Sequence, residues 1–302
     1  MTGPPQATAA VRLAVRRTLT DGPVLAAVSG GADSLALAAA LAFERPGAGA
    51  LVVDHGLQSG SARVAERAAD QCRVLGLTAQ VLRLPEATPR RAPGGPEAAA
   101  RDLRYALLEQ HAGEAVVLLG HTRDDQAETV LLGLARGSGT RAIAGMPVAR
   151  GRYRRPLLEV SRATARQACR EAGLSPWDDP HNLDPTYARV RARQALALLE
   201  EALGPGLTSS LSRTARLARQ DADALDALAD PTDDVRRLEQ LPAALLTRSL
   251  KRWVQAQSGR AVTSAHVDAL AELVTHWRGQ GPVSLPGGGS VRRVEGRLAF
   301  DA

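Results

Sequence analysis

The sequence predicts an α/β fold, a doubly wound parallel sheet, followed by a second, smaller and mostly helical domain. Two observations carry this prediction. Short apolar runs alternate with segments of helical periodicity, which is the pattern of parallel strands joined by crossover helices. A Gly-Pro-Gly break at residues 204–206 then separates this region from a tail in which helical segments predominate. We therefore place the α/β domain at residues 1–206 and the helical domain, with a small β tail, at residues 207–302.

The expected elements follow from the same patterns. The apolar runs of the first domain predict strands at residues 24–28, 50–53, 81–84 and 115–119, and a short edge element at residues 154–158. Helical periodicity predicts helices at residues 7–19, 35–41, 61–75, 97–111, 124–136, 162–172 and 187–203. In the tail we expect helices at residues 207–230, 241–257 and 264–277, and strands within residues 283–300.

The composition indicates a globular protein with an anionic partner. Of 302 residues, 44% are apolar and 23% are charged, and the net charge is +6. Between residues 141 and 220, fourteen arginines stand against seven carboxylates, which favours a nucleic-acid partner. No apolar run reaches the ~18 residues of a membrane-spanning helix, no signal-peptide pattern is present, and Cys72 and Cys169 form no C-x-x-C pair. We therefore expect a cytoplasmic protein with no membrane partner.

The first chemical motif is the hexad at residues 29–34, between the first strand and the helix after it. Paired glycines at such a turn let the backbone approach a ligand closely, and a helix N-terminus favours an anion. No lysine follows, so this is not a Walker loop, and a carboxylate beside an anion indicates an intervening Mg²⁺. An ordinary Gly-rich turn is the alternative. We predict a phosphate site formed by Ser29, Gly30, Gly31, Ala32, Asp33 and Ser34, with Asp33 as metal ligand.

Two further motifs come directly after the second and fourth strands. Because the carboxyl ends of parallel strands meet at one edge of a sheet, a single shared site is expected there. Asp54 and His55 follow the second strand, where the base or ribose of a nucleotide would lie, although His55 could equally be an ordinary buried histidine.

Residues 121–129 follow the fourth strand. Asp125 and Glu128 are three residues apart and so share a helix face, and with His121 they indicate metal ligands or a proton acceptor. Simple helix capping is an equal alternative for Asp124.

Arginines form two further groups. Arg101 and Arg104 are three residues apart on the helix that begins near Glu97, and form either a surface salt-bridge face or a contact with phosphate. Residues 187–193 alternate arginine with small apolar residues, and residues 150–155 are also basic. A solvent-exposed helix face without a specific function is one interpretation of this alternation, and a nucleic-acid track is the one we favour.

These motifs together resemble the PP-loop ATP pyrophosphatases, Rossmann-like enzymes that adenylate a substrate and release pyrophosphate. Within them the chain is most similar to the tRNA(Ile)-lysidine synthetase family, whose motifs it matches in order over nearly its whole length. The family usually has Asn at the position of Val190. The stretches that carry the resemblance are residues 29–34, 53–57, 97–105, 121–129, 136–139, 145–146, 155–158, 179–182, 187–193 and 241–288.

The resemblance implies a ligase that forms a C–N bond and uses ATP and Mg²⁺. ATP adenylates O2 of the wobble cytidine of an isoleucine tRNA with a CAU anticodon. The ε-amine of free L-lysine then attacks C2 and releases AMP, which gives lysidine. It further implies that residues 1–206 are catalytic and that residues 207–302 bind tRNA, and a homodimer is possible.

The resemblance also implies roles for individual residues. Asp125, ahead of His121, would accept the proton of the lysine amine, Glu128 would hold the ammonium or the metal, and Arg101 would face the cytidine or the phosphates. The hexad, Asp54 and His55 would bind the nucleotide. The residues expected to contact tRNA are Arg154, Arg155, Arg189, Arg191 and Arg193.

Three other functions are compatible with parts of the sequence. A PP-loop tRNA thiolase would share the hexad and the basic surface, but would be expected to place cysteines for sulfur transfer within its motifs. An adenylating enzyme acting on a small molecule would not need the Arg-rich segment at residues 141–220. A pure tRNA-binding protein would not need the acidic cluster beside the hexad.

Overall fold

The computed structural model describes residues 3–54, 56, 60–84, 95–137 and 139–302, with the side chains of residues 95–100 excepted. The chain divides into two compact units, residues 1–217 and 218–302. The predicted boundary after Gly206 instead marks the turn between helices α8 (Ala188–Leu203) and α9 (Leu207–Leu228). Because α9 runs without a break from one unit into the other, no linker sequence marks the division. Within the described part of the chain, no helix has both the length and the apolar character needed to cross a membrane.

The first unit is built on a six-stranded sheet of order β3-β2-β1-β4-β6-β5. All neighbours are parallel except β5 and β6, which form an antiparallel edge. This confirms the predicted α/β class. The strands are β1 (Val24–Val28), β2 (Gly49–Asp54), β3 (Thr78–Arg83), β4 (Val116–Leu119), β5 (Ala149–Arg150) and β6 (Tyr153–Arg154).

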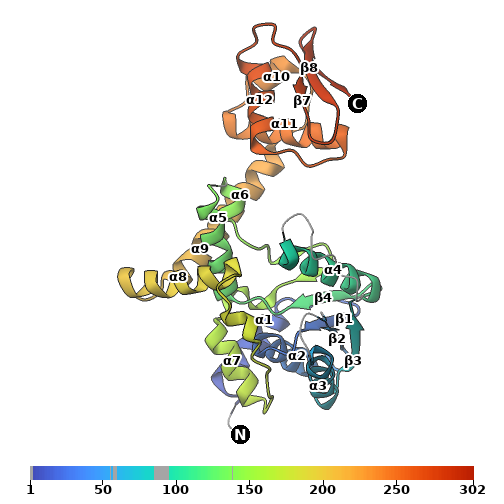
Figure 1. The fold of residues 1–302 in the computed structure, drawn as a ribbon, viewed down its shortest axis with the longest axis vertical. Helices are drawn as coiled ribbons and strands as arrows, with labels where there is room; N and C mark the ends of the chain where they lie inside the picture. The colour runs from blue at the N-terminus through green and yellow to red at the C-terminus, as the bar shows by residue number, and fades with distance from the viewer. Residues whose placement is uncertain (1–2, 55, 57–59, 85–94, 138) are drawn as a thin grey trace. The chain divides into compact units, whose positions relative to one another are not determined.

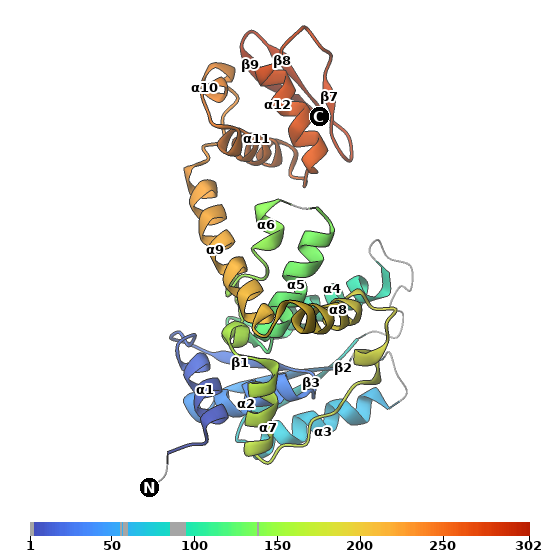
Figure 2. The ribbon, with the colours of Figure 1, turned by 90° about the vertical axis from the view of Figure 1, so that its left-hand side faces the viewer.

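Helices cover both faces of this sheet (Figures 1 and 2). On one face, α1, α2, α3 and α7 pack in a layer, and on the other lies α4. The helices of this unit are α1 (Gln6–Arg16), α2 (Ala32–Glu44), α3 (Ser61–Val74), α4 (Gly95–His111), α5 (Arg123–Ala135), α6 (Thr140–Ile143), α7 (Arg162–Glu171) and α8, with the 3₁₀ turns η1 (Pro156–Glu159) and η2 (Pro180–Leu183).

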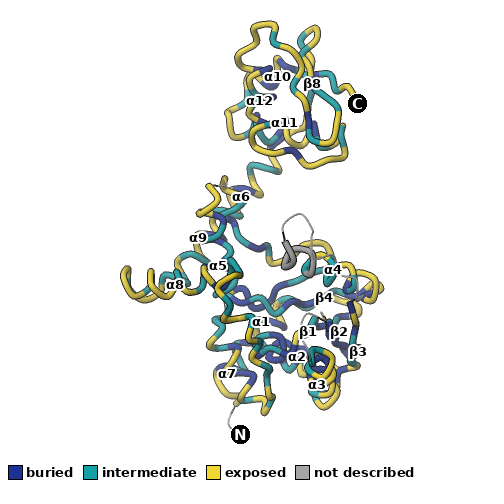
Figure 3. The backbone as a smooth tube through the Cα atoms, viewed as in Figure 1, coloured by how far each residue is buried: buried dark blue, intermediate teal, exposed yellow. Residues whose placement is uncertain are grey.

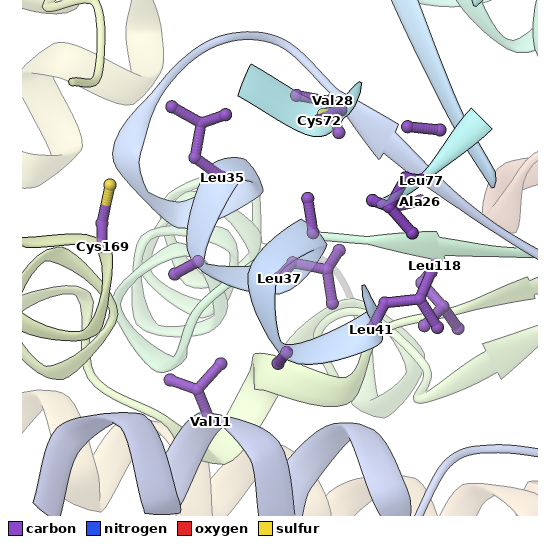
Figure 4. Close-up of a cluster of buried hydrophobic side chains, with 14 of the residues drawn as sticks. Val11, Ala26, Val28, Leu35, Leu37, Leu41, Cys72, Leu77, Leu118 and Cys169 are labelled. Carbon is purple, nitrogen blue, oxygen red and sulfur yellow. The ribbon is translucent and has the colours of Figure 1, made fainter. Parts of the chain in front are cut away.

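The alternation of side chains along each strand produces two separate cores. On β1, Ala26 points into the larger core beneath α2, whereas Leu25 and Ala27 join the smaller core beneath α4. Figure 4 shows the larger core, in which Leu37 and Leu41 of α2 pack toward Leu118 of β4. Because both faces are covered, the central strands β1 and β4 are apolar throughout, which is why simple apolar runs predicted them.

The two cysteines belong to this packing. Cys72 of α3 and Cys169 of α7 are fully buried and unpaired (Figure 4). Burial, above all, raises the pKa of each thiol to about 11. Both cysteines therefore act as small apolar core residues that stay protonated at neutral pH.

The second unit has its own core. Residues of its helices, including Leu238, Leu250 and Leu270, pack with Val291 and Leu298 of an antiparallel sheet of order β7-β8-β9. Figure 3 shows these buried positions enclosed by exposed ones. The elements are the end of α9, α10 (Val235–Glu239), α11 (Ala243–Ser258), α12 (Ser264–Thr275), β7 (Val283–Ser284), β8 (Ser290–Val294) and β9 (Arg297–Asp301).

Candidate active site

The phosphate-loop motif and the His121 motif meet at the edge of the sheet. β1 and β4 are parallel neighbours with Ala27 opposite Leu119, so the residues after both strands lie side by side. Gly120 follows β4 so closely against α2 that a Cβ there would lie 3.1 Å from the Ser34 Cα and 3.3 Å from the carbonyl carbon of Asp33. Only glycine permits this backbone approach without displacement.

The hexad forms a loop that leads into α2. Gly30 adopts a φ of +84°, a conformation that favours glycine, and Gly31 is the N-cap of the helix. Ser34 Oγ accepts a hydrogen bond from the Ser29 N–H at 3.1 Å and donates to the Gly31 carbonyl at 2.9 Å, so this hydroxyl shapes the loop. The N–H groups of the first turn of α2 have no intrahelical acceptor, which makes the loop suitable for an anion.

Asp33 of the loop has an unpartnered carboxylate oxygen. Its Oδ1 atom is buried and has no hydrogen-bond partner, and Oδ2 lies 3.7 Å from Nε of Arg162. Burial, foremost, and the negative charge of Asp125 raise the pKa of Asp33 to about 7. The described residues form no group of three metal-ligating side chains. A Mg²⁺ that bound Asp33 would therefore take its other ligands from phosphate and water, as this ion commonly does.

Asp125 has two functions that use different oxygens. Oδ2 accepts hydrogen bonds from the N–H of Thr122 at 2.7 Å and from its hydroxyl at 2.8 Å, which closes a capping box at the start of α5. Oδ1 accepts a hydrogen bond from Nη2 of Arg162 at 2.8 Å. Burial alone would raise the pKa of Asp125, but Arg162 and the Thr122 hydrogen bonds outweigh it, so the pKa lies below its ordinary value. Asp124, in turn, accepts a hydrogen bond from the backbone N–H of Arg162 at 2.8 Å.

Glu128 lies deepest in the site. It is 1% exposed, and its Oε1 accepts hydrogen bonds from Nη2 of Arg162 at 3.1 Å and from Nε of Arg193 at 2.8 Å. Its second oxygen, Oε2, is buried without a hydrogen-bond partner. Arg162 thus links Asp33, Asp125 and Glu128, and Arg193 adds a second contact to Glu128. We call these five residues, with Asp124, the carboxylate cluster.

His121 lies between this cluster and a group of positive charges. Burial, foremost, and the charges of Arg155, Arg104 and Arg189 lower the pKa of His121 to about 3, against the opposing effect of Asp125. The ring is therefore neutral at physiological pH. Its Nδ1 atom is buried without a partner.

Of the two arginines of α4, Arg104 is the one whose charge lowers the pKa of His121. Arg101 and Arg104 lie at 5.4 Å and 5.7 Å from the ring centroid of Tyr105, but only the charge of Arg104 acts appreciably on His121. Burial lowers the pKa of Arg104. The predicted contact of Arg101 with substrate stays a prediction.

Asp54 and a tryptophan line a pocket beside the phosphate loop. Asp54 is 8% exposed, and its Oδ1 accepts the N–H of Gly56 at 3.0 Å. The backbone N–H of Trp177 donates to the Gly30 carbonyl at 2.9 Å, which fixes the Trp177 segment against the loop. His55 lies outside the described residues. The pocket is lined by Ser29, Val53, Asp54, Ser61, Val64, Ala65 and Trp177.

The alternating arginines of α8 do not form one track. Residues two apart on a helix lie on nearly opposite sides, whereas residues four apart share a face. Arg193 accordingly pairs with Glu128, Arg189 acts on His121, and Arg191 is exposed and donates to the carbonyls of Pro185 and Thr186.

The two arginines before η1 also differ from each other. Arg154 is partly exposed and donates to the Gly151 carbonyl at 2.6 Å. Arg155 is only 4% exposed, and its Nη1 donates to the Pro147 carbonyl at 2.9 Å. The packing of β6 and η1 thus turns the Arg155 side chain inward, and its expected contact with tRNA stays a prediction.

Three residues that matter in this geometry were not singled out from the sequence. They are Arg162, which begins a predicted helix, and Trp177 and Gly120, which lie outside the predicted helices and strands. A Ser at position 161 that caps α7 was a usable signal, since it places the next side chain at a helix N-terminus facing the sheet edge. No signal in the sequence distinguished Trp177 or Gly120.

The fold and the glycine loop define the class of protein, and comparison with known families agrees. Residues 6–200 match the family model of the PP-loop domain, and residues 234–299 match that of the TilS substrate binding domain. The chain is 52% identical to the tRNA(Ile)-lysidine synthase of Thermobifida fusca, over 100% of both chains, and 48% identical to that of Streptomyces coelicolor, over 99% of both. The chain belongs to the tRNA(Ile)-lysidine synthase family.

A solved structure shares the fold at lower similarity. It is the U34-tRNA thiolase NcsA from Methanococcus maripaludis, determined with its 4Fe–4S cluster. The match has a TM-score of 0.58 at 18% sequence identity and covers 70% of this chain and 80% of that one. At this identity the likeness establishes the PP-loop fold alone.

Proposed function

We propose that this protein ligates L-lysine to C2 of the wobble cytidine of isoleucine tRNA in an ATP-dependent reaction that forms lysidine. One observation supports this above the others. The phosphate loop and a carboxylate cluster share one site, with the backbone of Asp33 and Ser34 in near contact with Gly120. Such a site suits a reaction in which a nucleotide and a cationic nucleophile must meet.

The nucleotide is assigned to the edge of the sheet beside β1. The first-turn N–H groups of α2 and the loop of Gly30 and Gly31 would hold its phosphates. Asp33 would hold a Mg²⁺, which when bound neutralises phosphate charge. The pocket with Asp54 and Trp177 would take the nucleoside.

The lysine is assigned to the carboxylate cluster. An ammonium group is held best by carboxylates that keep their charge, and Arg162 and Thr122 keep Asp125 ionised. Oε2 of Glu128 is buried and lacks a hydrogen-bond partner, so it is a natural acceptor for an ammonium donor.

The ε-amine must lose a proton before it attacks, because its ordinary pKa is about 10.4. Asp125 is the proton acceptor that we favour, through Oδ1, since Oδ2 is committed to Thr122. Neutral His121 is the second candidate, because its unpartnered Nδ1 can take part in a relay.

Arginine side chains provide charge for the tRNA. Arg189, Arg154 and the exposed Arg191 remain candidates to contact its backbone, with Arg104 and Arg101 closer to the cytidine. We assign recognition of a CAU anticodon stem-loop to this face, and assign other tRNA contacts to the second unit, whose residues 234–299 match the substrate-binding model.

A tRNA thiolase is the rival that the fold alone would allow. Its chemistry needs a reactive thiolate or a cluster, and the chain has two cysteines only. Both lie in the core of the first unit with a pKa raised to about 11, so neither supplies a nucleophile at neutral pH.

The decisive experiment is incorporation of radiolabelled lysine into an isoleucine tRNA transcript with a CAU anticodon. We expect incorporation that requires ATP and yields one AMP and one pyrophosphate for each lysine attached. A methionine tRNA, which carries the same anticodon, and arginine in place of lysine are the controls. ATP consumption without lysine incorporation, or transfer of sulfur to the tRNA, would refute the proposal.

A further inference from the structure

One guanidinium group connects the nucleotide half of the site to the lysine half. Nη2 of Arg162 lies 2.8 Å from Oδ1 of Asp125 and 3.1 Å from Oε1 of Glu128, and its Nε lies 3.7 Å from Oδ2 of Asp33. Asp33 belongs to the phosphate loop, whereas the other two carboxylates belong to α5. Arg162 is the first residue of α7, so it enters the site from a third element.

The base of this side chain is fixed, and its end is partly exposed. The backbone N–H of Arg162 donates to Oδ2 of Asp124 at 2.8 Å, which anchors the start of α7 to α5. The side chain itself is 20% exposed, and its guanidinium donates hydrogen bonds to Asp125 and Glu128. The 3.7 Å separation from Asp33 is longer than a hydrogen bond.

The charges of the cluster are unbalanced. Four carboxylates, of Asp33, Asp124, Asp125 and Glu128, meet two guanidinium groups, of Arg162 and Arg193. Two carboxylate oxygens are buried without hydrogen-bond partners: Oδ1 of Asp33 and Oε2 of Glu128. The Glu128 side chain is only 1% exposed. The cluster therefore favours additional cations, yet Arg162 lies at the oxygens that an incoming ammonium would need.

We propose that Arg162 is a positioning residue that couples nucleotide binding to lysine binding. In the arrangement of the structure, Arg162 neutralises Asp125 and Glu128. Phosphates bound at the start of α2 draw its guanidinium toward the phosphate loop, and this movement opens the two carboxylates to the ammonium of lysine. The inference rests on the proposed function, and it makes lysine binding follow nucleotide binding.

The physical basis is a competition between anions for one arginine. Guanidinium groups bind phosphate through paired hydrogen bonds, which are stronger than contacts to a single carboxylate oxygen. Arg162 contacts Asp125 and Glu128 through Nη2 only, so each of these contacts is a single hydrogen bond. Glu128 keeps Arg193 when Arg162 leaves, so the buried charge is never without a partner.

The test measures lysine affinity with and without a nucleotide. Calorimetric titration of lysine is performed on the full chain, alone and saturated with α,β-methylene-ATP and Mg²⁺. For the unaltered protein we expect lysine to bind about tenfold more tightly with the analogue, within the usual range of coupling between two sites. For Arg162→Gln, a neutral side chain of similar reach, we expect tighter binding without nucleotide and a ratio close to one.

Two further variants serve as controls. Arg170→Gln removes the same charge two turns along α7, from an exposed side chain that donates to Gln167, and should keep the tenfold ratio. Arg162→Lys retains the charge without the paired geometry and should restore at least a threefold ratio. This variant also keeps the test open if Arg162→Gln does not fold.

The outcomes separate this inference from the proposed function. Equal lysine affinity with and without the analogue in the unaltered protein, or a tenfold ratio that survives in Arg162→Gln, overturns the coupling role. If labelled lysine still enters the tRNA in that case, the proposed function stands and only the inference fails. If no lysine enters the tRNA, the proposed function fails first.

Discussion

Asp125→Asn is the substitution that tests the site most directly, because Asp125 acts on both stability and chemistry. The side chain is 16% exposed and accepts hydrogen bonds with both oxygens, two from Thr122 and one from Arg162. Asparagine has one acceptor oxygen in place of two. It can therefore keep the capping box or the Arg162 contact, and it turns an N–H group toward the donor at the other end.

The expected loss follows from these contacts. A hydrogen bond to a charged group contributes about 1.5–3 kcal/mol, so loss of the Arg162 contact should lower the free energy of unfolding by about 2 kcal/mol. In a unit of this size, each kcal/mol corresponds to about 2–4 °C, so the Tm should fall by about 4–8 °C. If Asp125 also accepts the proton of the lysine amine, turnover should fall by about 10²–10⁴-fold.

The assays are thermal unfolding followed by circular dichroism and incorporation of labelled lysine below the lowered Tm. Asp70→Asn is the matched control, because Asp70 is 69% exposed and pairs only with Arg73 on the surface of α3. It should change the Tm by less than about 1 °C. A Tm of Asp125→Asn equal to that of the unaltered protein would refute the energetic account of the Asp125 hydrogen bonds. Near-normal lysine incorporation would refute the catalytic assignment.

Three further predictions concern other parts of the site. Gly120→Ala should lower the free energy of unfolding by about 1–3 kcal/mol and weaken ATP binding, because the added Cβ would press on the start of α2. Calorimetry measures both effects, and Gly139→Ala is the control because a Cβ at position 139 would meet no atom within 4 Å. His121→Gln should flatten the pH dependence of stability between about pH 6.5 and 4. The folded protein keeps His121 neutral, with a pKa of about 3, whereas the unfolded chain binds a proton below about pH 6.5, so His121 lowers the free energy of unfolding as the pH falls. Urea titrations at several pH values should show this loss, which is up to about 1.4 kcal/mol for each pH unit. Arg191→Ala should reduce the slope of tRNA affinity against salt by about one phosphate contact and leave the Tm unchanged, whereas Arg193→Ala should lower the Tm because Glu128 is 1% exposed; the reverse pattern would contradict the assignment of the two faces of α8.

Much of the α/β domain could be predicted from the sequence, because its central strands are buried on both faces. The run at residues 24–28 coincides with β1, and the run at residues 50–53 lies within β2. Periodicity likewise predicted α3 and α7 to within a residue at their ends. The short elements α6, β5 and α10 were not predicted, since two to five residues carry no periodic signal.

The sequence predicted which segments meet at the site, but not which side chains contact one another there. The rule that ligands bind at the carboxyl ends of parallel strands brings residues 29–34 and 121–128 together, and the structure has them adjacent. The partners of each side chain depend on helix phase and packing. That is why Arg193 lies in the carboxylate cluster, and why buried Arg155 does not lie on the surface.

The position of Trp177 has an optical consequence. The chain contains three tryptophans, and the other two, Trp253 and Trp277, belong to the second unit. Trp177 is therefore the sole indole of the first unit, and it lines the pocket beside the phosphate loop. With Trp253→Phe and Trp277→Phe, the emission of this one fluorophore would report the arrival and departure of a nucleotide in real time, without any added label.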